Sequence, residues 1–154
     1  MKRITSFVLI GCMLLCLFPV LSNADEDRCG NMEMVEYLSD GSYFVTEIER
    51  IETLDKGTVS FLKQLHYYNS SDDLQWTMKL NAAFTYNGTT AACTSCSVTY
   101  TIQNTAWHYD SKQETIDGNV ATGTLTMVKK LLGIPIKTVT RTLTITCDKD
   151  GNVS

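Results

Sequence analysis

The two histidines of the chain are its clearest candidates for acid–base chemistry. His108 lies in the sequence Trp107-His108-Tyr109-Asp110, where Asp110 could orient the imidazole as a carboxylate does in a hydrolytic centre. The sequence shows no nucleophile or metal-binding motif beside this pair, so a hydrolase that uses His108 and Asp110 is a weaker alternative to a protein without enzymatic activity. His66 falls on the polar side of an alternating pattern, where a histidine is usually only solvated. The sequence therefore predicts no catalytic residue and a protein that is not an enzyme.

Four of the six cysteines lie after residue 24. The CxxC spacing of Cys93 and Cys96 suits a redox pair or a zinc site. A thioredoxin-like redox pair stands at the start of a helix, whereas the residues that follow Cys96 have the pattern of a β-strand. A zinc site would need Cys29 and Cys147 to converge on the same point. An even number of cysteines in an exported domain favours two disulfides and leaves their pairing open. We predict a disulfide-stapled domain without a metal or a cofactor.

Acidic turns and threonine runs are further candidates for ligand binding. The sequences Asp72-Asp73 and Asp148-x-Asp150-Gly151-Asn152 resemble fragments of calcium loops, although the second lacks the distal glutamate of such a loop. Ordinary turn chemistry explains both. Alternating threonines can present a regular hydroxyl array to ice or to a polysaccharide, but threonine also simply suits the solvent side of a sheet, which is the interpretation we adopt. The threonines concerned are Thr122, Thr124 and Thr126, then Thr138, Thr140, Thr142, Thr144 and Thr146, with Thr99 and Thr101 as possible neighbours.

Large apolar side chains near strand ends give the best candidates for a binding surface. Trp107 and Tyr109 can stack on a sugar ring, although burial in the core is the commoner fate of a tryptophan. The sequence Lys129-Lys130-Leu131-Leu132-Gly133-Ile134-Pro135 places apolar residues in a hairpin loop behind two lysines. Such a loop can contact a membrane or a partner. It can also cap the open end of the core, which we expect instead. The predicted binding residues are Trp107, Tyr109, Leu131, Leu132 and Ile134.

The elements that must position these residues are β-strands. Apolar side chains occupy every second position of residues 74–86 and polar ones fill the gaps, as in a long strand with one buried face. Turn sequences such as Asn87-Gly88 and Asp117-Gly118-Asn119 separate further alternating segments. No segment carries a convincing helical stripe of apolar residues. The predicted strands cover about residues 33–38, 42–51, 58–69, 74–86, 96–102, 121–127 and 139–147.

Strands joined by short turns predict an all-β fold. Each strand buries one face, so an antiparallel meander of seven to eight strands must form a sandwich or a partly open barrel. The length of the strands favours a strongly curved sheet or barrel slightly, and such a sheet can hold a ligand.

The N-terminal sequence has the features of an export signal. Lys2 and Arg3 precede a mostly apolar run over residues 4–21, and Ser22-Asn23-Ala24 supplies small residues at a cleavage site. We predict a signal peptide over residues 1–24 and a single secreted domain over residues 25–154. One alternative is an uncleaved anchor. Another is a lipid anchor at Cys12, because Leu9-Ile10-Gly11-Cys12 has the form of a lipoprotein signal.

Composition and charge exclude several classes of protein. The 154-residue chain contains 44% apolar and 9% aromatic residues, too many for a disordered protein. It has 13 Lys and Arg against 17 Asp and Glu, and Lys2 and Arg3 leave with the signal, so the net charge falls from −4 to −6. That charge argues against nucleic acid or an anionic membrane surface as a partner.

The mature chain also contains a set of distinctive turn and strand sequences. They are Asp40-Gly41-Ser42-Tyr43, Tyr67-Tyr68-Asn69-Ser70-Ser71, Phe84-Thr85-Tyr86-Asn87-Gly88-Thr89-Thr90, Ala121-Thr122-Gly123, Leu132-Gly133-Ile134-Pro135 and the run from Thr138 to Cys147. With them the chain resembles a group of small secreted all-β proteins of unknown function from Gram-positive, clostridia-like bacteria. The resemblance spans nearly the whole mature chain and implies a bacterial, secreted β-domain. It also implies a Cys93–Cys147 disulfide, which leaves Cys29 with Cys96.

These observations predict a secreted, non-enzymatic β-domain that binds an extracellular glycan, lipid or protein. The expected contacts are the strand-end loops at residues 107–110 and 129–135. The alternative is a small secreted toxin or bacteriocin-like effector, which the export signal, the small size and the apolar hairpin favour. We expect no nucleic-acid partner and no stable membrane span once the signal is removed.

Overall fold

The structure is a computed structural model that describes residues 34–52 and 57–154. The predicted signal peptide and Cys12, Cys16 and Cys29 lie outside the described residues. The described part consists of strands and turns, and it contains no helix that is long and apolar enough to cross a membrane. The strands are β1 (Met34–Tyr37), β2 (Tyr43–Glu52), β3 (Thr58–Tyr68), β4 (Leu74–Tyr86), β5 (Ala91–Ile102), β6 (Trp107–Asp117), β7 (Val120–Leu131) and β8 (Ile134–Thr146).

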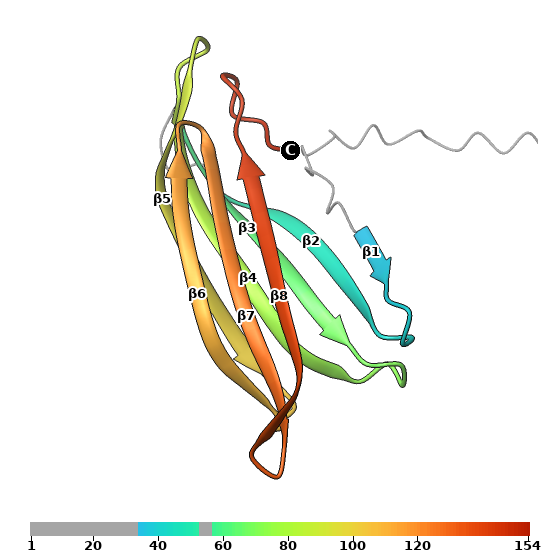
Figure 1. Cartoon of the computed structure of the whole chain (residues 1–154). Helices are drawn as coiled ribbons and strands as arrows, with labels where there is room; N and C mark the ends of the chain where they lie inside the picture. The colour runs from blue at the N-terminus through green and yellow to red at the C-terminus, as the bar shows by residue number, and fades with distance from the viewer. Residues whose placement is uncertain (1–33, 53–56) are drawn as a thin grey trace, which may run out of the picture.

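The strands form two antiparallel sheets that pack face to face (Figure 1). The first sheet has the order β1-β2-β3-β4-β5 and the second has the order β6-β7-β8. Within each sheet every strand pairs with its neighbours in the chain, and the β5–β6 connection crosses from the first sheet to the second. This arrangement confirms the predicted antiparallel meander. The two sheets remain separate, so the fold is a sandwich and no closed barrel forms.

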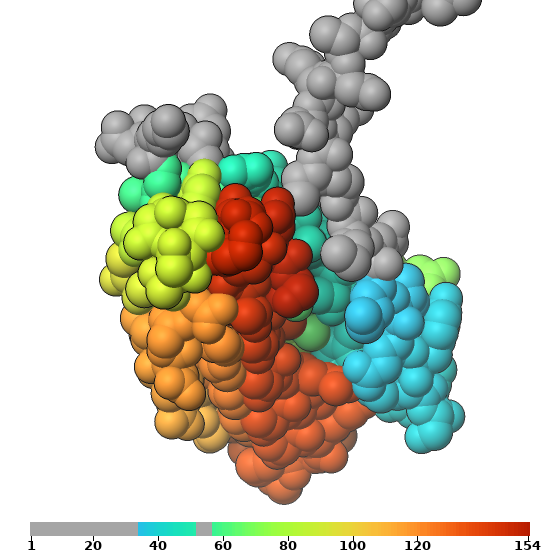
Figure 2. Space-filling view, turned by 90° about the horizontal axis from the view of Figure 1, so that it is seen from above, coloured from blue at the N-terminus to red at the C-terminus, as the bar shows by residue number. Residues whose placement is uncertain are grey.

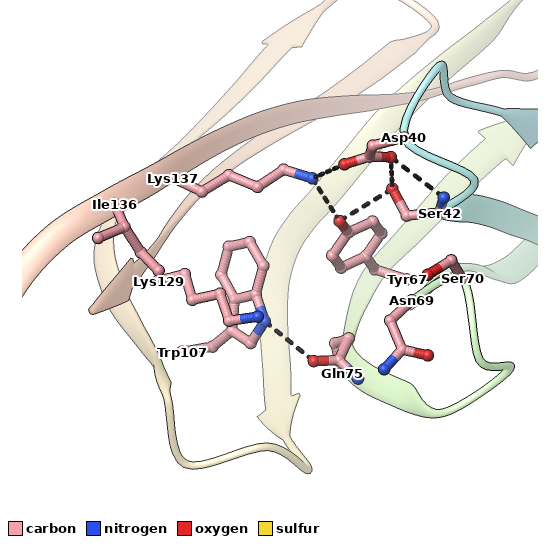
Figure 3. Close-up of a pocket in the computed structure, with 10 residues that line it drawn as sticks. All are labelled: Asp40, Ser42, Tyr67, Asn69, Ser70, Gln75, Trp107, Lys129, Ile136 and Lys137. Carbon is pink, nitrogen blue, oxygen red and sulfur yellow. Dashed lines mark hydrogen bonds and ion pairs between the residues drawn. The ribbon is translucent and has the colours of Figure 1, made fainter. Parts of the chain in front are cut away.

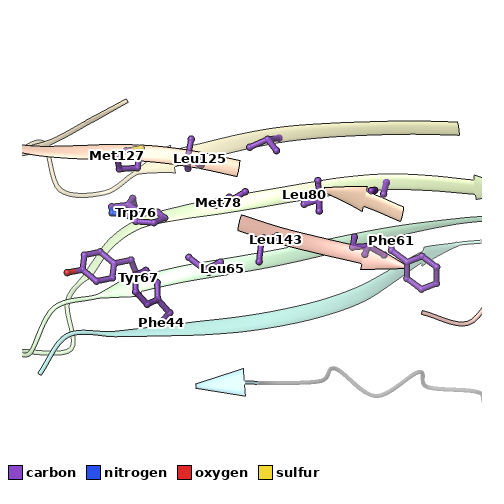
Figure 4. Packing of buried hydrophobic residues seen from close by; sticks show 14 of the residues in the cluster. Phe44, Phe61, Leu65, Tyr67, Trp76, Met78, Leu80, Leu125, Met127 and Leu143 are labelled. Atoms are coloured by element: carbon purple, nitrogen blue, oxygen red, sulfur yellow. The ribbon is translucent and has the colours of Figure 1, made fainter. Parts of the chain in front are cut away.

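The core lies between the sheets and follows the alternation of β4. Trp76, Met78 and Leu80 are fully buried there, and they face Leu125 and Met127 of β7 in the second sheet (Figure 4). Burying each of these side chains contributes about 1.5–3 kcal/mol. The other large buried residues are Phe44, Val59, Phe61, Leu65, Tyr67, Phe84, Val98, Trp107, Leu143 and Ile145.

Gly123 in β7 lets the two sheets approach each other closely. A Cβ atom at this position would lie 2.3 Å from Cγ2 of Val98 and 2.9 Å from Cδ1 of Leu80. Both distances are shorter than van der Waals contact, so a larger residue would push the sheets apart.

β6 is the one strand that the alternating pattern does not predict. Its first residue, Trp107, is buried, but the ten residues that follow are exposed. A strand with no buried face has no reason to alternate apolar and polar residues, so its sequence carries no period-two signal. A β-bulge between Tyr109 and Ser111 further breaks the register with β7.

Side chains join the two sheets along the β5–β6 side. The Glu114 carboxylate accepts a hydrogen bond from the Val98 amide at 2.7 Å, and Lys112 Nζ donates to the Val98 carbonyl at 2.8 Å. Tyr100 of β5 stacks on Tyr109 of β6, with ring centroids 4.9 Å apart.

The opposite side of the sandwich lies between β8 and the strands β1 to β3. Figure 2 shows β8 with β7 on one side of it and β1 and β2 on the other. Arg141 of β8 pairs with Glu36 at 2.9 Å, and its guanidinium carbon lies 3.9 Å from the centroid of the Phe44 ring. Lys63 Nζ donates to the Thr144 carbonyl at 2.9 Å. Charged side chains therefore close this side of the core.

The three described cysteines carry free thiols, so no disulfide of the predicted framework forms among the described residues, and the predicted partner of Cys96, Cys29, lies outside them. In place of the Cys93–Cys147 bridge implied by the family resemblance, both thiols contact carbonyl groups. The Cys93 thiol donates to the Ser95 carbonyl at 3.2 Å and the Cys147 thiol to the Asp148 carbonyl at 3.5 Å. Burial raises the pKa of all three thiols, including that of Cys96.

Candidate functional site

The β7–β8 hairpin extends beyond the rest of the molecule (Figure 1), and its tip consists of exposed apolar residues. We define the hairpin tip as Leu131, Leu132, Ile134 and Ile136, whose exposed fractions are 61%, 95%, 65% and 56%. The expectation that this loop caps the core is wrong, because these side chains lie in solvent. The structure thus brings three of the predicted binding residues together at one exposed point.

The turn at the tip has an unfavourable residue in its first central position. Leu131 pairs with Ile134, which leaves Leu132 and Gly133 as a two-residue turn with φ angles of 51° and 82°. Two positive φ angles define the type I′ turn, for which Asn-Gly is the preferred sequence. A leucine in this left-handed region costs about 1–2 kcal/mol. Local stability therefore does not explain why a leucine occupies position 132.

Three lysines surround the root of the hairpin. Lys137 pairs with Asp40 at 2.7 Å. Lys129 and Lys130 make no ion pair with any described residue. The hairpin arm, which we define as residues 128–140, contains these three lysines and no acidic residue. The apolar tip is therefore backed by a locally basic segment.

A cavity of about 320 Å³ lies at the root of the hairpin, between the two sheets (Figure 3). The turns β1–β2 and β3–β4 form one wall, and β6 with the root of the hairpin forms the other. Because the lining residues come from distant parts of the chain, only the complete fold creates this cavity. They are Asp40, Ser42, Tyr67, Asn69, Ser70, Gln75, Trp107, Lys129, Ile136 and Lys137.

A network of hydrogen bonds fixes one wall of the cavity (Figure 3). Lys137 Nζ donates to the Asp40 carboxylate at 2.7 Å and to the Tyr67 hydroxyl at 2.8 Å. The Tyr67 hydroxyl donates to Ser42 Oγ at 3.1 Å, and Ser42 Oγ donates to Asp40. The hydrogen bond from Lys137, followed by those from Ser42, holds the pKa of Asp40 well below its usual range. Lys137 is committed to this network, which leaves Lys129 as the unpaired cation of the cavity among the described residues.

Trp107 forms the floor of the cavity. Only 2% of its surface is exposed, so this predicted binding residue is buried in the core, which is the commoner fate of a tryptophan. Its indole N–H donates to Gln75 Oε1 at 3.3 Å, and the Asn104 amide donates to the same oxygen at 2.9 Å. Tyr109, also a predicted binding residue, is not among the residues that line the cavity, because its ring stacks on Tyr100.

The residues proposed for acid–base chemistry do not meet. His108 Nδ1 lies 3.2 Å from the Ala106 carbonyl oxygen, and the Asp110 carboxylate accepts a hydrogen bond from Ser111 at 3.2 Å. No hydrogen bond or ion pair joins the His108 and Asp110 side chains, because Asp110 occupies the bulge in β6. His66 bonds to the Thr77 hydroxyl at 3.1 Å on the outer face of the first sheet.

The threonines of β7 and β8 form an ordered array on the outer face of the second sheet. Thr124 bonds to Thr142 at 2.9 Å and Thr126 to Thr140 at 3.0 Å, so these hydroxyls partly satisfy each other across the strands. Thr99 and Thr101 do not join this array, because they lie on β5 in the first sheet. The array is consistent with the solvent-facing role that the sequence predicts.

Turn chemistry accounts for both acidic sequences. The Asp148 carboxylate accepts hydrogen bonds from the backbone amides of Asp150 and Asn152, each at 2.9 Å. In the β3–β4 turn, Asn69 Oδ1 accepts from the amides of Ser71 and Asp73. These interactions are typical of Asx turns.

The sequence alone does not reveal the polar wall of the cavity. Asp40 and Ser42 are recognisable as turn residues, and Lys137 as a strand residue, but 97 positions separate Asp40 from its lysine partner. Gln75 is also missed, since it stands on the polar side of a strand and would be expected in solvent. Its burial follows from the β5–β6 connection, in which Asn104 folds back onto it.

The chain was also compared with known proteins. No protein-family model, curated protein or solved structure matches it.

Proposed function

We propose that the protein is a secreted, non-enzymatic binding domain that contacts its partner through the hairpin end of the sandwich. The hairpin end comprises the hairpin tip and the cavity at its root. The observation that carries this proposal is Leu132, which is 95% exposed and held at a positive φ angle. An apolar side chain placed at an energetic cost in full contact with water gains its stabilisation only when a partner covers it.

The size of the apolar tip supports the same proposal. Four neighbouring side chains of the tip are each more than half exposed, and they lie on a projection instead of in the flank of a sheet. Contiguous apolar surface of this kind is typical of sites that contact a protein or a membrane. The cavity beside it adds polar groups that can orient what the tip holds.

Export and disulfide formation belong to this proposal. The sequence 1–24 supports export, and an oxidising compartment would favour disulfides. The amides of Cys93 and Cys147 donate to the carbonyls of the adjacent residues Gly118 and Asn119, which brings both cysteines to the β6–β7 turn. Non-reducing digestion of protein secreted by its host is expected to give a Cys93–Cys147 peptide. Recovery of both cysteines as alkylated thiols would contradict this pairing.

The binding proposal can be tested with the envelope fraction of the source cells. Purified mature domain is mixed with this fraction and sedimented, and the bound amount is compared for the wild type, Leu132→Asn and Ile116→Asn. Ile116 is 49% exposed near the opposite end of the sandwich and serves as the matched control for loss of an exposed apolar side chain. We expect Leu132→Asn to lower binding about tenfold or more, since burial of a leucine contributes about 1.5–3 kcal/mol. Equal binding by Leu132→Asn and the wild type would exclude the hairpin as the contact.

A further inference from the structure

We infer that the partner of the hairpin end is a phospholipid bilayer, with the hairpin tip in the interfacial layer and Lys129 and Lys130 at the level of the lipid phosphates. This inference rests on the proposed function and names the class of its partner. The supporting observations are the small size of the hairpin tip, its reach beyond the lysines and the positive charge at the root of the hairpin.

The tip is too small and too convex for a stable protein interface. Its four side chains project from a hairpin, whereas a stable protein–protein interface takes roughly 20–30 residues from each partner. The tip also contains no aromatic residue, and the exposed rings of Tyr109 and Tyr37 pack on Tyr100 and Tyr43, respectively. Sugar recognition commonly relies on a free aromatic face. A fluid apolar phase needs neither a complementary shape nor a ring.

The reach of the tip matches the depth of interfacial insertion. Leu131 and Leu132 extend the strand by two residues beyond Lys130, which corresponds to about 7 Å at the rise of a β-strand. Apolar groups of peripheral proteins enter the boundary between headgroups and acyl chains by about 5–10 Å. With the leucines at this depth, the ammonium groups at the root of the hairpin stand at the level of the phosphates.

The root of the hairpin supplies free cations at that level. Among the described residues Lys129 and Lys130 have no acidic partner, while Lys137 is held by Asp40. Lys129 also lines the 320 Å³ cavity, where Ser70 adds a hydrogen-bonding group, whereas the Asn69 side chain is bonded within the β3–β4 turn (Figure 3). A phosphate of the headgroup layer can therefore be held by Lys129 together with Ser70.

The acidic charge of the whole domain does not prevent this contact. The net charge of −6 argues against attraction to an anionic surface from a distance. At the short range of a docked hairpin, only nearby charges count, because salt screens the others over about 8–10 Å. The hairpin arm carries three lysines and no acidic residue, and Asp40 offsets the charge of Lys137, so Lys129 and Lys130 supply the local positive charge.

Co-sedimentation with phospholipid vesicles tests the inference. The probes are vesicles of phosphatidylcholine alone and vesicles that also contain phosphatidylglycerol. The variants are Leu132→Asn, the double variant Lys129→Gln/Lys130→Gln, and Ile116→Asn as the control. We expect the wild type and Ile116→Asn to bind, and Leu132→Asn to lose about tenfold or more in affinity. The lysine variant should bind several-fold less tightly to the phosphatidylglycerol vesicles and lose most of the salt dependence of binding.

Two outcomes would overturn the lipid inference. The first is that the wild type does not sediment with either kind of vesicle, and the second is that Leu132→Asn binds vesicles as well as the wild type. If envelope binding depends on Leu132 while vesicles are not bound, the partner is a protein or a glycan, and the proposed function stands without the lipid inference. If neither assay depends on Leu132, the proposed function fails as well.

Discussion

At the scale of single residues, substitution of Leu132 should have opposite effects on the stability of the fold and on partner binding. The left-handed backbone at this position favours asparagine, so Leu132→Asn should stabilise the fold by about 1 kcal/mol while it weakens partner binding. Urea unfolding of the two proteins measures the first effect. A stabilised variant that binds poorly cannot owe its defect to misfolding. If the variant were less stable than the wild type, the leucine would be contributing to the fold.

Asp40 makes the stability of the hairpin end depend on pH. Hydrogen bonds from Lys137 and Ser42 lower the pKa of Asp40 below its ordinary value of 3.8. A carboxyl group whose pKa is lowered by folding stabilises the protein above the unfolded pKa, and this contribution is lost as the pH falls through the folded pKa. We therefore expect Asp40→Asn to be less stable than the wild type at pH 7. The gap should close as the pH falls below about 4.

Thermal unfolding from pH 7 to pH 2 checks this expectation for Asp40. Asp117→Asn is a suitable control, because no hydrogen bond or ion pair holds the Asp117 carboxylate among the described residues. A constant difference between the wild type and Asp40→Asn across this range would contradict the role of the Asp40 network.

At the scale of elements, β7 determines how closely the two sheets pack. Gly123→Ala would place its new methyl group 2.3 Å from Val98 and 2.9 Å from Leu80. The cost of this overpacking is about 1–3 kcal/mol and outweighs the small gain of replacing a strand glycine. Urea unfolding should show the loss, whereas Thr122→Ala on the outer face of β7 should change stability by less than about 0.5 kcal/mol. A neutral Gly123→Ala variant would mean that the sheets separate easily.

β8 closes its side of the sandwich by packing more than by charge. Arg141 is 25% exposed and covers the Phe44 ring, while its partner Glu36 is 54% exposed. We expect Arg141→Ala to cost about 1–2 kcal/mol through lost packing and cation–π contact. Glu36→Gln should cost less than about 0.5 kcal/mol, as is usual for an exposed ion pair. Similar losses in both variants would show that the ion pair dominates.

The same elements show what the sequence could and could not predict. β4 is predicted over its full length, because one of its faces is buried and alternation follows burial. β6 is missed because it is exposed, and the chain then has no physical reason to alternate. The apolar residues of the hairpin can be recognised in the sequence. Their exposure cannot be predicted from it, since it depends on how far β7 and β8 extend beyond the end of the first sheet. The contact of Asp40 with Lys137 requires the complete fold.

At the scale of the whole molecule, the two ends of the sandwich have different characters. The hairpin end combines the apolar tip, a cavity and two lysines that have no ion-pair partner among residues 34–52 and 57–154. The opposite end holds tight turns, Cys93 and Cys147, and the C-terminal Asx turn. The outer face of the second sheet offers the threonine array as a competing contact surface. Binding at the hairpin end must therefore be distinguished from binding at the threonine array by direct measurement.

Photo-crosslinking from defined positions makes this distinction. A benzoylphenylalanine residue replaces Leu132 in one variant, Thr124 in a second and Ile116 in a third, and each is irradiated with the envelope fraction of the source cells. We expect an adduct from position 132 and none from positions 124 and 116, because the proposed contact lies at the hairpin end. Adducts from position 124, with none from position 132, would contradict binding through the hairpin end and assign binding to the threonine face.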